Sequence, residues 1–116
     1  IFTISITRFE SLKAKNILEK IGIKVGIINI LWLKPLIIKA KWLQALQKSK
    51  FGGIVIDDDY VNGVSKSIAN DLNLKSGKKI FTMGLKNRSA GFHINADNLP
   101  PNAKEIVKKI KKIMIK

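Results

Sequence analysis

Cysteine is absent from the 116 residues of this chain, and histidine occurs once, at position 93. Without cysteine there is no disulfide framework, no thiolate metal cluster and no cysteine nucleophile. His93 stands between Phe92 and Ile94, with no second histidine to complete a metal site. These absences argue against a small disulfide-stapled secreted scaffold and against a zinc site.

A long uninterrupted apolar run is also missing. The longest apolar stretch, residues 21–38, is broken by two lysines, an asparagine and a proline. A membrane-spanning helix needs about 20 consecutive apolar residues. Residues 1–4 show no basic region before an apolar run, so they do not form a signal peptide. We therefore expect no membrane association, and we interpret the chain as a fragment of a longer protein that begins at a strand.

Acidic residues are scarce relative to basic ones. The chain has 22 Lys and Arg against 8 Asp and Glu, a net charge of +14. Only Arg8 and Arg88 are arginines, the side chain that binds phosphate and guanine through paired hydrogen bonds. Lysine instead occupies most polar positions, as a general composition bias would produce. A basic nucleic-acid-binding module remains an alternative, because high charge alone predicts only non-specific attraction.

The remaining composition is that of one globular domain covering residues 1–116, with 46% apolar and 26% charged residues. Apolar strand-like runs alternate with amphipathic segments. Strands are predicted at residues 2–6, 23–30, 54–56 and 79–83, and helices at 7–21, 38–49, 63–72 and 102–114. Four successive strand–helix units predict a three-layer α/β/α fold with a mostly parallel, doubly wound sheet in the strand order 2-1-3-4.

Several local signals support these elements. Thr7–Glu10 and Asn102–Glu105 each fit a capping box at a helix start. Gly22 stands where a left-handed helix end is needed. The run at residues 23–30 is apolar on both faces, which favours a central strand. The expected buried stripe of the first helix is Ala14, Ile17, Leu18 and Ile21.

Ligands and partners of such sheets gather at the carboxyl ends of the strands, here residues 7–8, 31–36, 57–63 and 84–88. Asp57, Asp58 and Asp59 could hold a divalent cation there. Neighbouring strand side chains point in opposite directions, however, so a strand end leading into a turn is the favoured interpretation. The serines near Gly63 have no histidine beside them, and no catalytic set is predicted. The lysines of residues 108–116 are expected to form a solvated face, with a docking patch for an acidic partner as the alternative.

Several segments, in this order, resemble the C-terminal domain of the transketolase superfamily of thiamine-diphosphate enzymes. They are Ile4-Ser5-Ile6, Gly22-Ile23-Lys24-Val25 with Ile28-Asn29, Leu33-Lys34-Pro35-Leu36, Ile54-Val55-Ile56-Asp57-Asp58-Asp59-Tyr60 with Asn62-Gly63, and Gly84-Leu85-Lys86-Asn87-Arg88. The resemblance covers essentially the whole chain. It is closer to the beta subunit of 2-oxo-acid dehydrogenases and to deoxyxylulose-phosphate synthase than to transketolase proper.

The resemblance implies a non-catalytic domain of a cytoplasmic enzyme acting on carbon–carbon bonds next to a carbonyl. In the family, thiamine diphosphate and magnesium are held by two preceding domains, so no catalytic, cofactor or metal residue is expected here. The domain supports a homodimer and borders the active-site entrance. The residues expected at that entrance or interface are Asp58, Asp59, Tyr60, Gly63 and Trp32. For Trp32, core packing is an equal alternative.

The net charge helps to choose between the two kinds of relative. In the dehydrogenase complexes, the domain that this chain resembles is a docking surface for a basic domain of the acyltransferase core. A chain at +14 with a lysine-rich last helix would repel such a partner. A stand-alone synthase or transketolase-like enzyme is therefore favoured, and a beta subunit of a 2-oxo-acid dehydrogenase complex is the alternative.

Overall fold

The computed structural model describes residues 1–85 and 99–115 of the chain. Strands and helices alternate along these residues. The strands are β1 (Phe2–Ile4), β2 (Ile28–Ile30), β3 (Gly53–Tyr60) and β4 (Ile80–Leu85). The helices are α1 (Thr7–Lys20), α2 (Ala40–Lys48), α3 (Val64–Ser76) and α4 (Ala103–Ile115).

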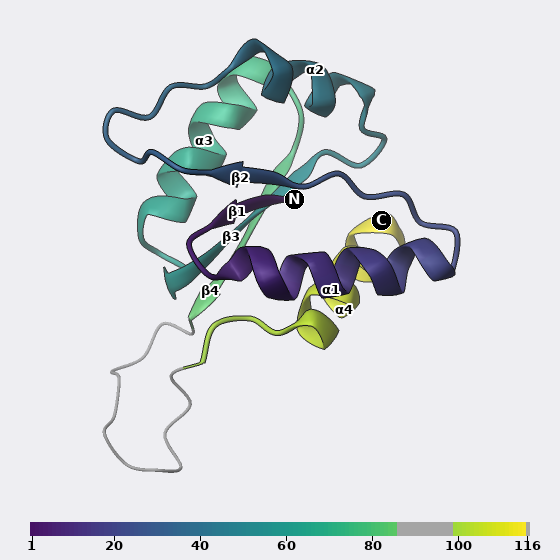
Figure 1. Cartoon of the computed structure of the whole chain (residues 1–116). Helices are drawn as coiled ribbons and strands as arrows, with labels where there is room; N and C mark the ends of the chain where they lie inside the picture. The colour runs from purple at the N-terminus through teal and green to yellow at the C-terminus, as the bar shows by residue number, and fades with distance from the viewer. Residues whose placement is uncertain (86–98, 116) are drawn as a thin grey trace.

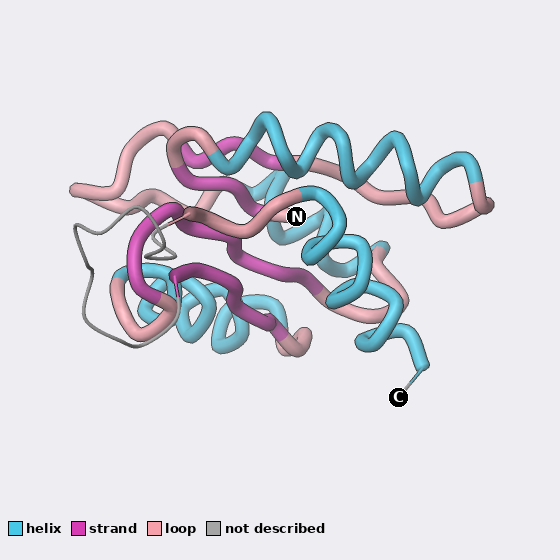
Figure 2. Tube along the Cα trace, turned by 90° about the horizontal axis from the view of Figure 1, so that it is seen from below, coloured by secondary structure: helices cyan, strands magenta, loops and turns pink. Residues whose placement is uncertain are grey.

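The strands form one parallel sheet in the order β2-β1-β3-β4, which places β1 and β3 in the centre. Helices α2 and α3 cover one face, and α1 and α4 cover the other (Figure 1). Figure 2 looks onto the sheet from the second side and shows α1 and α4 next to each other. The predicted three-layer α/β/α architecture and its strand order are confirmed.

A hydrophobic cluster fills each side of the sheet. The cluster under α2 and α3 consists of Phe2, Ile4, Ile30, Trp42, Leu46, Val55, Ile68, Ala69 and Leu72. The cluster under α1 and α4 consists of Ala14, Leu18, Ile54, Ile56, Ala103, Ile106 and Val107. Side chains of β3 alternate between the two clusters, as the pleat of a strand requires. Each large side chain that is fully buried contributes about 1.5–3 kcal/mol to the free energy of unfolding.

The prediction of a long central strand at residues 23–30 is wrong in both length and position. β2 contains only Ile28–Ile30 and lies at the edge of the sheet. β1 begins at Phe2, which pairs with Ile28, so residues 23–27 lie outside the pairing of β1 with β2, apart from the hydrogen bond that the Ile1 nitrogen donates to the Gly26 carbonyl oxygen. The apolar character of this segment has another use, because Ile23 and Val25 pack against the cluster under α1 and α4.

The ends of the other strands also differ from the prediction. β1 stops at Ile4 rather than residue 6, because Ser5 adopts a left-handed conformation with φ of 57°. β3 continues past Ile56 to Tyr60, which pairs with Leu85 at the end of β4. The register shifts between Ile56 and Tyr60, so the acidic residues form a bulge within the strand.

The start of α1 is predicted correctly, but its capping box is not present. The structure gives α1 no side-chain cap, because Thr7 and Glu10 bind elsewhere. The buried stripe is also different: it consists of Thr7, Ser11, Ala14 and Leu18, whereas Ile17 and Ile21 are largely exposed. The left-handed Gly22 after α1 is confirmed, with φ of 83°.

The start of α4 confirms the second capping box. The backbone N–H of Glu105 donates to Asn102 Oδ1 at 2.9 Å, and the N–H of Asn102 donates to Glu105 Oε2 at 3.4 Å. Glu10 adds a third contact, because its carboxylate accepts a 2.8 Å hydrogen bond from the backbone N–H of Ala103. Helices α1 and α4 are therefore joined by a polar link as well as by their shared apolar cluster.

Candidate functional site

The carboxyl ends of β1, β3 and β4 meet at one edge of the sheet, where the sequence predicts a site. Thr7 is buried at this edge and fixes its geometry. The Thr7 hydroxyl lies 2.7 Å from the carbonyl oxygen of Ile4 and 3.0 Å from that of Ile56, and it accepts a hydrogen bond from the Ile4 N–H. Thr7 thus ties β1 to β3 and has no free hydroxyl for a ligand.

The three aspartates of β3 do not converge. Asp57 is 2% exposed, Asp58 is half-buried and Asp59 is exposed. Asp57 Oδ1 accepts the N–H of Asp59 at 3.2 Å, whereas Asp59 Oδ1 accepts the N–H of Tyr60 at 2.7 Å. The three carboxylates therefore differ in burial, and only that of Asp59 is exposed.

Asp57 is unusual because Oδ2 is buried with no hydrogen-bond partner among the described residues. Burial raises the pKa of the Asp57 carboxyl above its usual value of 3.8, and the neighbouring Asp58 carboxyl raises it further. Hydrogen bonds from the backbone of Asp59 and Asp58 offset part of this increase. The charged form of Asp57 is therefore disfavoured in the folded protein.

Two glycines shape the turn beside these aspartates. The Gly63 N–H donates to the carbonyl oxygen of Tyr60 at 2.9 Å, which closes the turn before α3. Gly84 on β4 faces the bulge so closely that a Cβ would lie 2.6 Å from the carbonyl oxygen of Asp59. Tyr60 and Gly63 therefore belong to one tight turn, which the bulge positions at the sheet edge.

Trp32 lies at the same edge and is 76% exposed, which excludes the core alternative for this chain. Leu31 is equally exposed, and Ile6 and Phe9 are 53% and 56% exposed at the start of α1. Ile6 and Phe9 follow β1, and Leu31 and Trp32 follow β2. These two strands end side by side, because Ile4 of β1 is in register with Ile30 of β2. We call Ile6, Phe9, Leu31 and Trp32 the carboxyl-edge patch.

Of this patch, the sequence predicts only Trp32. The pattern predicts Ile6 in a strand, and the isoleucines of α1 predict a different buried face for that helix. Phe9 lies outside the Thr7, Ser11, Ala14 and Leu18 stripe, so a stripe chosen on its small residues would have revealed it. Exposed large apolar side chains of this kind mark interaction surfaces.

Several expected positions fall outside the described residues, namely Arg88, His93 and the rest of residues 86–98. Within residues 1–85 and 99–115, no group of three Asp, Glu or His side chains is arranged to hold a metal ion. None of the helices in these ranges combines the length and apolarity needed to span a bilayer. The carboxyl-edge patch and the acidic turn beside it are therefore the features of this edge to which a function can be attached.

Comparison with known proteins adds no assignment. No model of a known protein family matches the chain, and no curated protein matches it at a significant level.

Proposed function

We propose that the chain is the C-terminal, non-catalytic domain of a thiamine-diphosphate-dependent, transketolase-like enzyme that acts on carbon–carbon bonds next to a carbonyl. Its role is to support a homodimer and to border the active-site entrance. The carboxyl-edge patch is the observation that supports this proposal best. It exposes four large apolar side chains, and a tryptophan that is 76% exposed is costly to leave in water.

The fold is compatible with this role. The acidic turn at Asp58, Asp59, Tyr60 and Gly63 and the carboxyl-edge patch lie at the same edge of the sheet. Domains that bind preceding thiamine-diphosphate domains and a second subunit need apolar contact area together with polar groups near the entrance. Thiamine diphosphate and magnesium would be supplied by those preceding domains, and their chemistry is not assigned to any residue of this chain.

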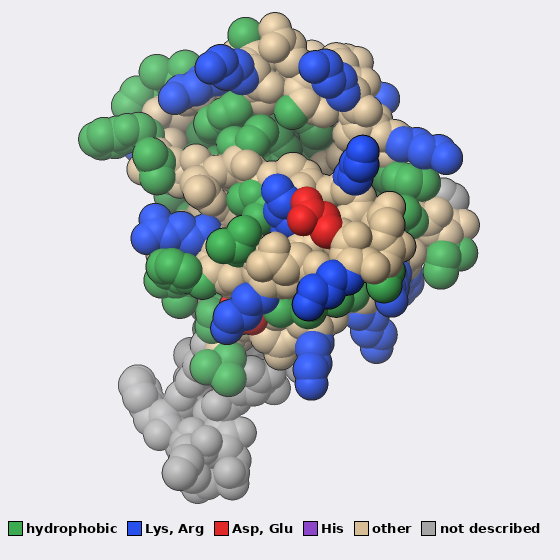
Figure 3. All heavy atoms as spheres, turned by 45° about the vertical axis from the view of Figure 1, so that its right-hand side comes forward, with side chains coloured by type: hydrophobic (Ala, Val, Ile, Leu, Met, Phe, Trp, Pro, Cys, Tyr) green, Lys and Arg blue, Asp and Glu red, His purple; other side chains and the backbone are tan. Residues whose placement is uncertain are grey.

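Two other functions are alternatives to this proposal. A beta subunit of a 2-oxo-acid dehydrogenase complex would place the domain against a basic partner, which the net charge of +14 disfavours. A nucleic-acid-binding module would use the lysines directly. Figure 3 shows lysines spread over one face of the molecule rather than gathered in a single stripe, which favours the enzyme-domain proposal.

Self-association tests the proposal through Trp32. The chain is expected to form a dimer in sedimentation velocity, and Trp32→Ala is expected to weaken that dimer by at least tenfold because interface tryptophans are frequent hot spots. The melting temperature should hardly change, since the side chain is largely exposed. Leu74→Ala on α3 is the matched control, because Leu74 is 73% exposed away from the carboxyl-edge patch.

Two results would contradict the proposal. One is an unchanged dimer in Trp32→Ala, or an equal loss in Leu74→Ala. The other is saturable micromolar binding of thiamine diphosphate and magnesium to the chain alone in calorimetric titration, since the proposal places both on preceding domains.

A further inference from the structure

The edge of the sheet opposite the carboxyl-edge patch contains a cavity of about 600 Å³, which is within the range of about 300–1,000 Å³ typical of small-molecule sites. Its walls come from the segment after α1, the end of α2 with the link to β3, and the last turns of α4. The apolar side chains that line it include Ile23, Val25, Phe51, Ile110, Ile113 and Met114. Each of them is half-buried, so they remain available to an apolar ligand.

The charged side chains around this cavity are of one sign. Lys24, Lys48 and Lys50 line it, and no Asp or Glu does so among the described residues. Figure 3 shows this side of the molecule, with hydrophobic side chains in a hollow and lysines around it. Glu19 lines an adjoining shallow hollow, where its carboxylate forms an ion pair with Lys15 at 3.6 Å.

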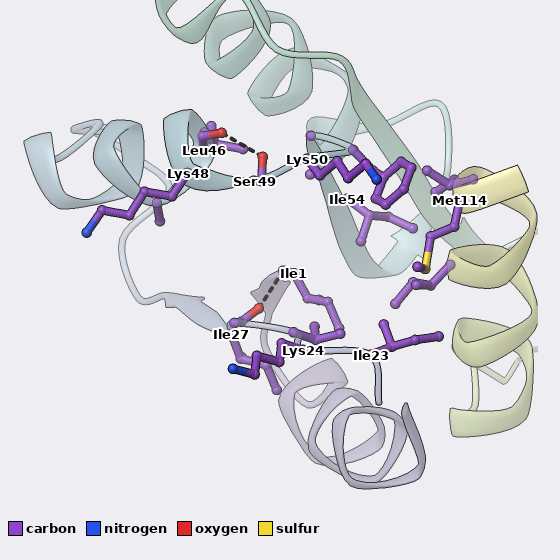
Figure 4. Close-up of a pocket in the computed structure, with 18 of the residues that line it drawn as sticks. Ile1, Ile23, Lys24, Ile27, Leu46, Lys48, Ser49, Lys50, Ile54 and Met114 are labelled. Atoms are coloured by element: carbon purple, nitrogen blue, oxygen red, sulfur yellow. Dashed lines mark hydrogen bonds between the residues drawn. The ribbon is translucent and has the colours of Figure 1, made fainter. Parts of the chain in front are cut away.

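The lysines differ in direction. In Figure 4, Lys48 extends away from the cavity, while Lys50 lies at its wall. The Lys50 ammonium is 5.4 Å from the centre of the Phe51 ring, which holds it beside the apolar surface. Lys24 lines the opposite wall, and its side chain runs along the segment beside Ile27. Lys24 and Lys50 are therefore the cations that a ligand in the cavity would meet.

The helix ends oppose these lysines only in part. Helices α1, α2 and α4 end at this edge, and each contributes a partial charge of about −0.5, less in total than the two positive charges of Lys24 and Lys50. The field at the cavity mouth is positive, and it favours an anionic head group.

We propose that this cavity binds a free medium-chain fatty acid, with the aliphatic tail against Ile110, Ile113 and Met114 and the carboxylate at the cavity mouth, in the field of Lys24 and Lys50. Only an amphipathic anion uses both properties of the site. A second copy of this chain would bring like charges together across the same lysines, and a neutral alkane would leave them unused. The site is separate from the carboxyl-edge patch, so it does not depend on the proposed function.

Calorimetric titration of the 116-residue chain with dodecanoate below its micelle concentration tests the proposal. We expect one molecule to bind per chain. Decanoate lacks two methylene groups and should bind about tenfold more weakly. Dodecyltrimethylammonium has the same tail with the opposite charge and should bind at least tenfold more weakly. Equal affinity for the two chain lengths, or for the two head groups, would overturn the proposal.

Two variants locate the site. Ala45→Trp adds a large side chain at an exposed position of the cavity wall and should reduce dodecanoate affinity at least tenfold. Gln44→Trp, on the neighbouring residue outside the wall, is the matched control. If Ala45→Trp does not fold, Gly26→Leu replaces it, because a Cβ on Gly26 meets no atom within 4 Å. Full affinity in the obstructed variant would show that the ligand binds elsewhere.

Charge variants separate the site from general attraction to lysine. The double variant Lys24→Gln/Lys50→Gln should bind dodecanoate about threefold to tenfold more weakly. Lys66→Gln/Lys104→Gln removes the same charge from the starts of α3 and α4 and should bind like the unmodified chain. An equal loss in both pairs, or several ligands bound per chain, would mean non-specific binding. A dimer that Ala45→Trp abolishes would assign the cavity to self-association and overturn the proposal.

Discussion

Glu10 shows how one side chain can stabilise a helix to which it does not belong. Its carboxylate accepts a 2.8 Å hydrogen bond from the N–H of Ala103, which is one of the first amides of α4 and lacks a partner within that helix. This hydrogen bond lowers the pKa of the Glu10 carboxyl below its usual value of 4.5, and Lys13 at 3.1 Å lowers it further. The charged form is therefore the stabilising one.

We predict that Glu10→Ala lowers the free energy of unfolding by about 1 kcal/mol at pH 7, as the loss of a helix cap does. The contribution of Glu10 is present above pH 4.5 and disappears as pH falls through the lowered pKa, so the two proteins should become equally stable in acid. Urea unfolding across this pH range measures the difference. Glu19→Ala, which breaks only an exposed ion pair with Lys15, should cost less than about 0.5 kcal/mol.

Asp57 has the opposite pH dependence. Because its folded-state pKa is raised, the folded protein binds a proton more readily than the unfolded chain between pH 3.8 and that raised pKa. Its unfavourable effect is thus present at pH 7 and is relieved as pH falls. Asp57→Asn keeps the shape and removes the charge, and we expect it to raise the free energy of unfolding at pH 7 by about 1–3 kcal/mol.

Thermal melts at pH 7 and at pH 4 check this prediction. The stabilisation of Asp57→Asn should be larger at pH 7. Asp59→Asn is the control, because Asp59 is exposed and should change stability little. A less stable Asp57→Asn at pH 7 would mean that the carboxylate has a favourable partner.

For the helices and strands, a local sequence pattern predicts correctly only those features that depend on contacts within the same short segment. Asn102–Glu105 forms its capping box through hydrogen bonds between the two residues themselves. Thr7–Glu10 has an equally good pattern, yet Thr7 binds the carbonyl of Ile56 and Glu10 binds Ala103, which are 49 and 93 residues away. No local pattern contains these partners. The candidate site follows the same rule, since the exposure of Phe9 depends on which face of α1 meets the sheet.

A substitution at Gly84 tests how rigid the bulge between β3 and β4 is. A Cβ at this position would lie 2.6 Å from the carbonyl oxygen of Asp59 and 3.0 Å from the nitrogen of Val61, so the backbone must move to admit it. We predict that Gly84→Ala lowers the free energy of unfolding by about 1–3 kcal/mol. Gly26→Ala is the control, with no atom within 4 Å, and should be neutral or slightly stabilising. Chemical denaturation of both variants provides the comparison, and equal stabilities would show that the bulge is easily reshaped.

For the whole molecule, the net charge of +14 predicts behaviour toward nucleic acid. We expect weak binding to duplex DNA in low salt that falls steeply as the salt concentration rises, without preference for sequence, because lysines release counterions from any phosphate backbone. Fluorescence anisotropy with two unrelated duplexes and a single strand measures this. Tight, sequence-selective binding at physiological salt would instead support the nucleic-acid-binding alternative over the enzyme domain.

The cluster shared by α1 and α4 has a consequence for protein synthesis. The apolar residues Ala14 and Leu18 leave the ribosome early, but the residues that cover them, Ile106 and Val107, are translated near the end of the described chain. Until α4 emerges, the part of this face that α1 does not cover stays open to water and to other nascent chains. The opposite face is completed earlier, once α3 and β4 have been made, by residue 85. The two faces of the sheet are therefore covered at different times, and a nascent chain that has emerged from the ribosome through residue 85 but not through residue 103 should present a surface that chaperones bind.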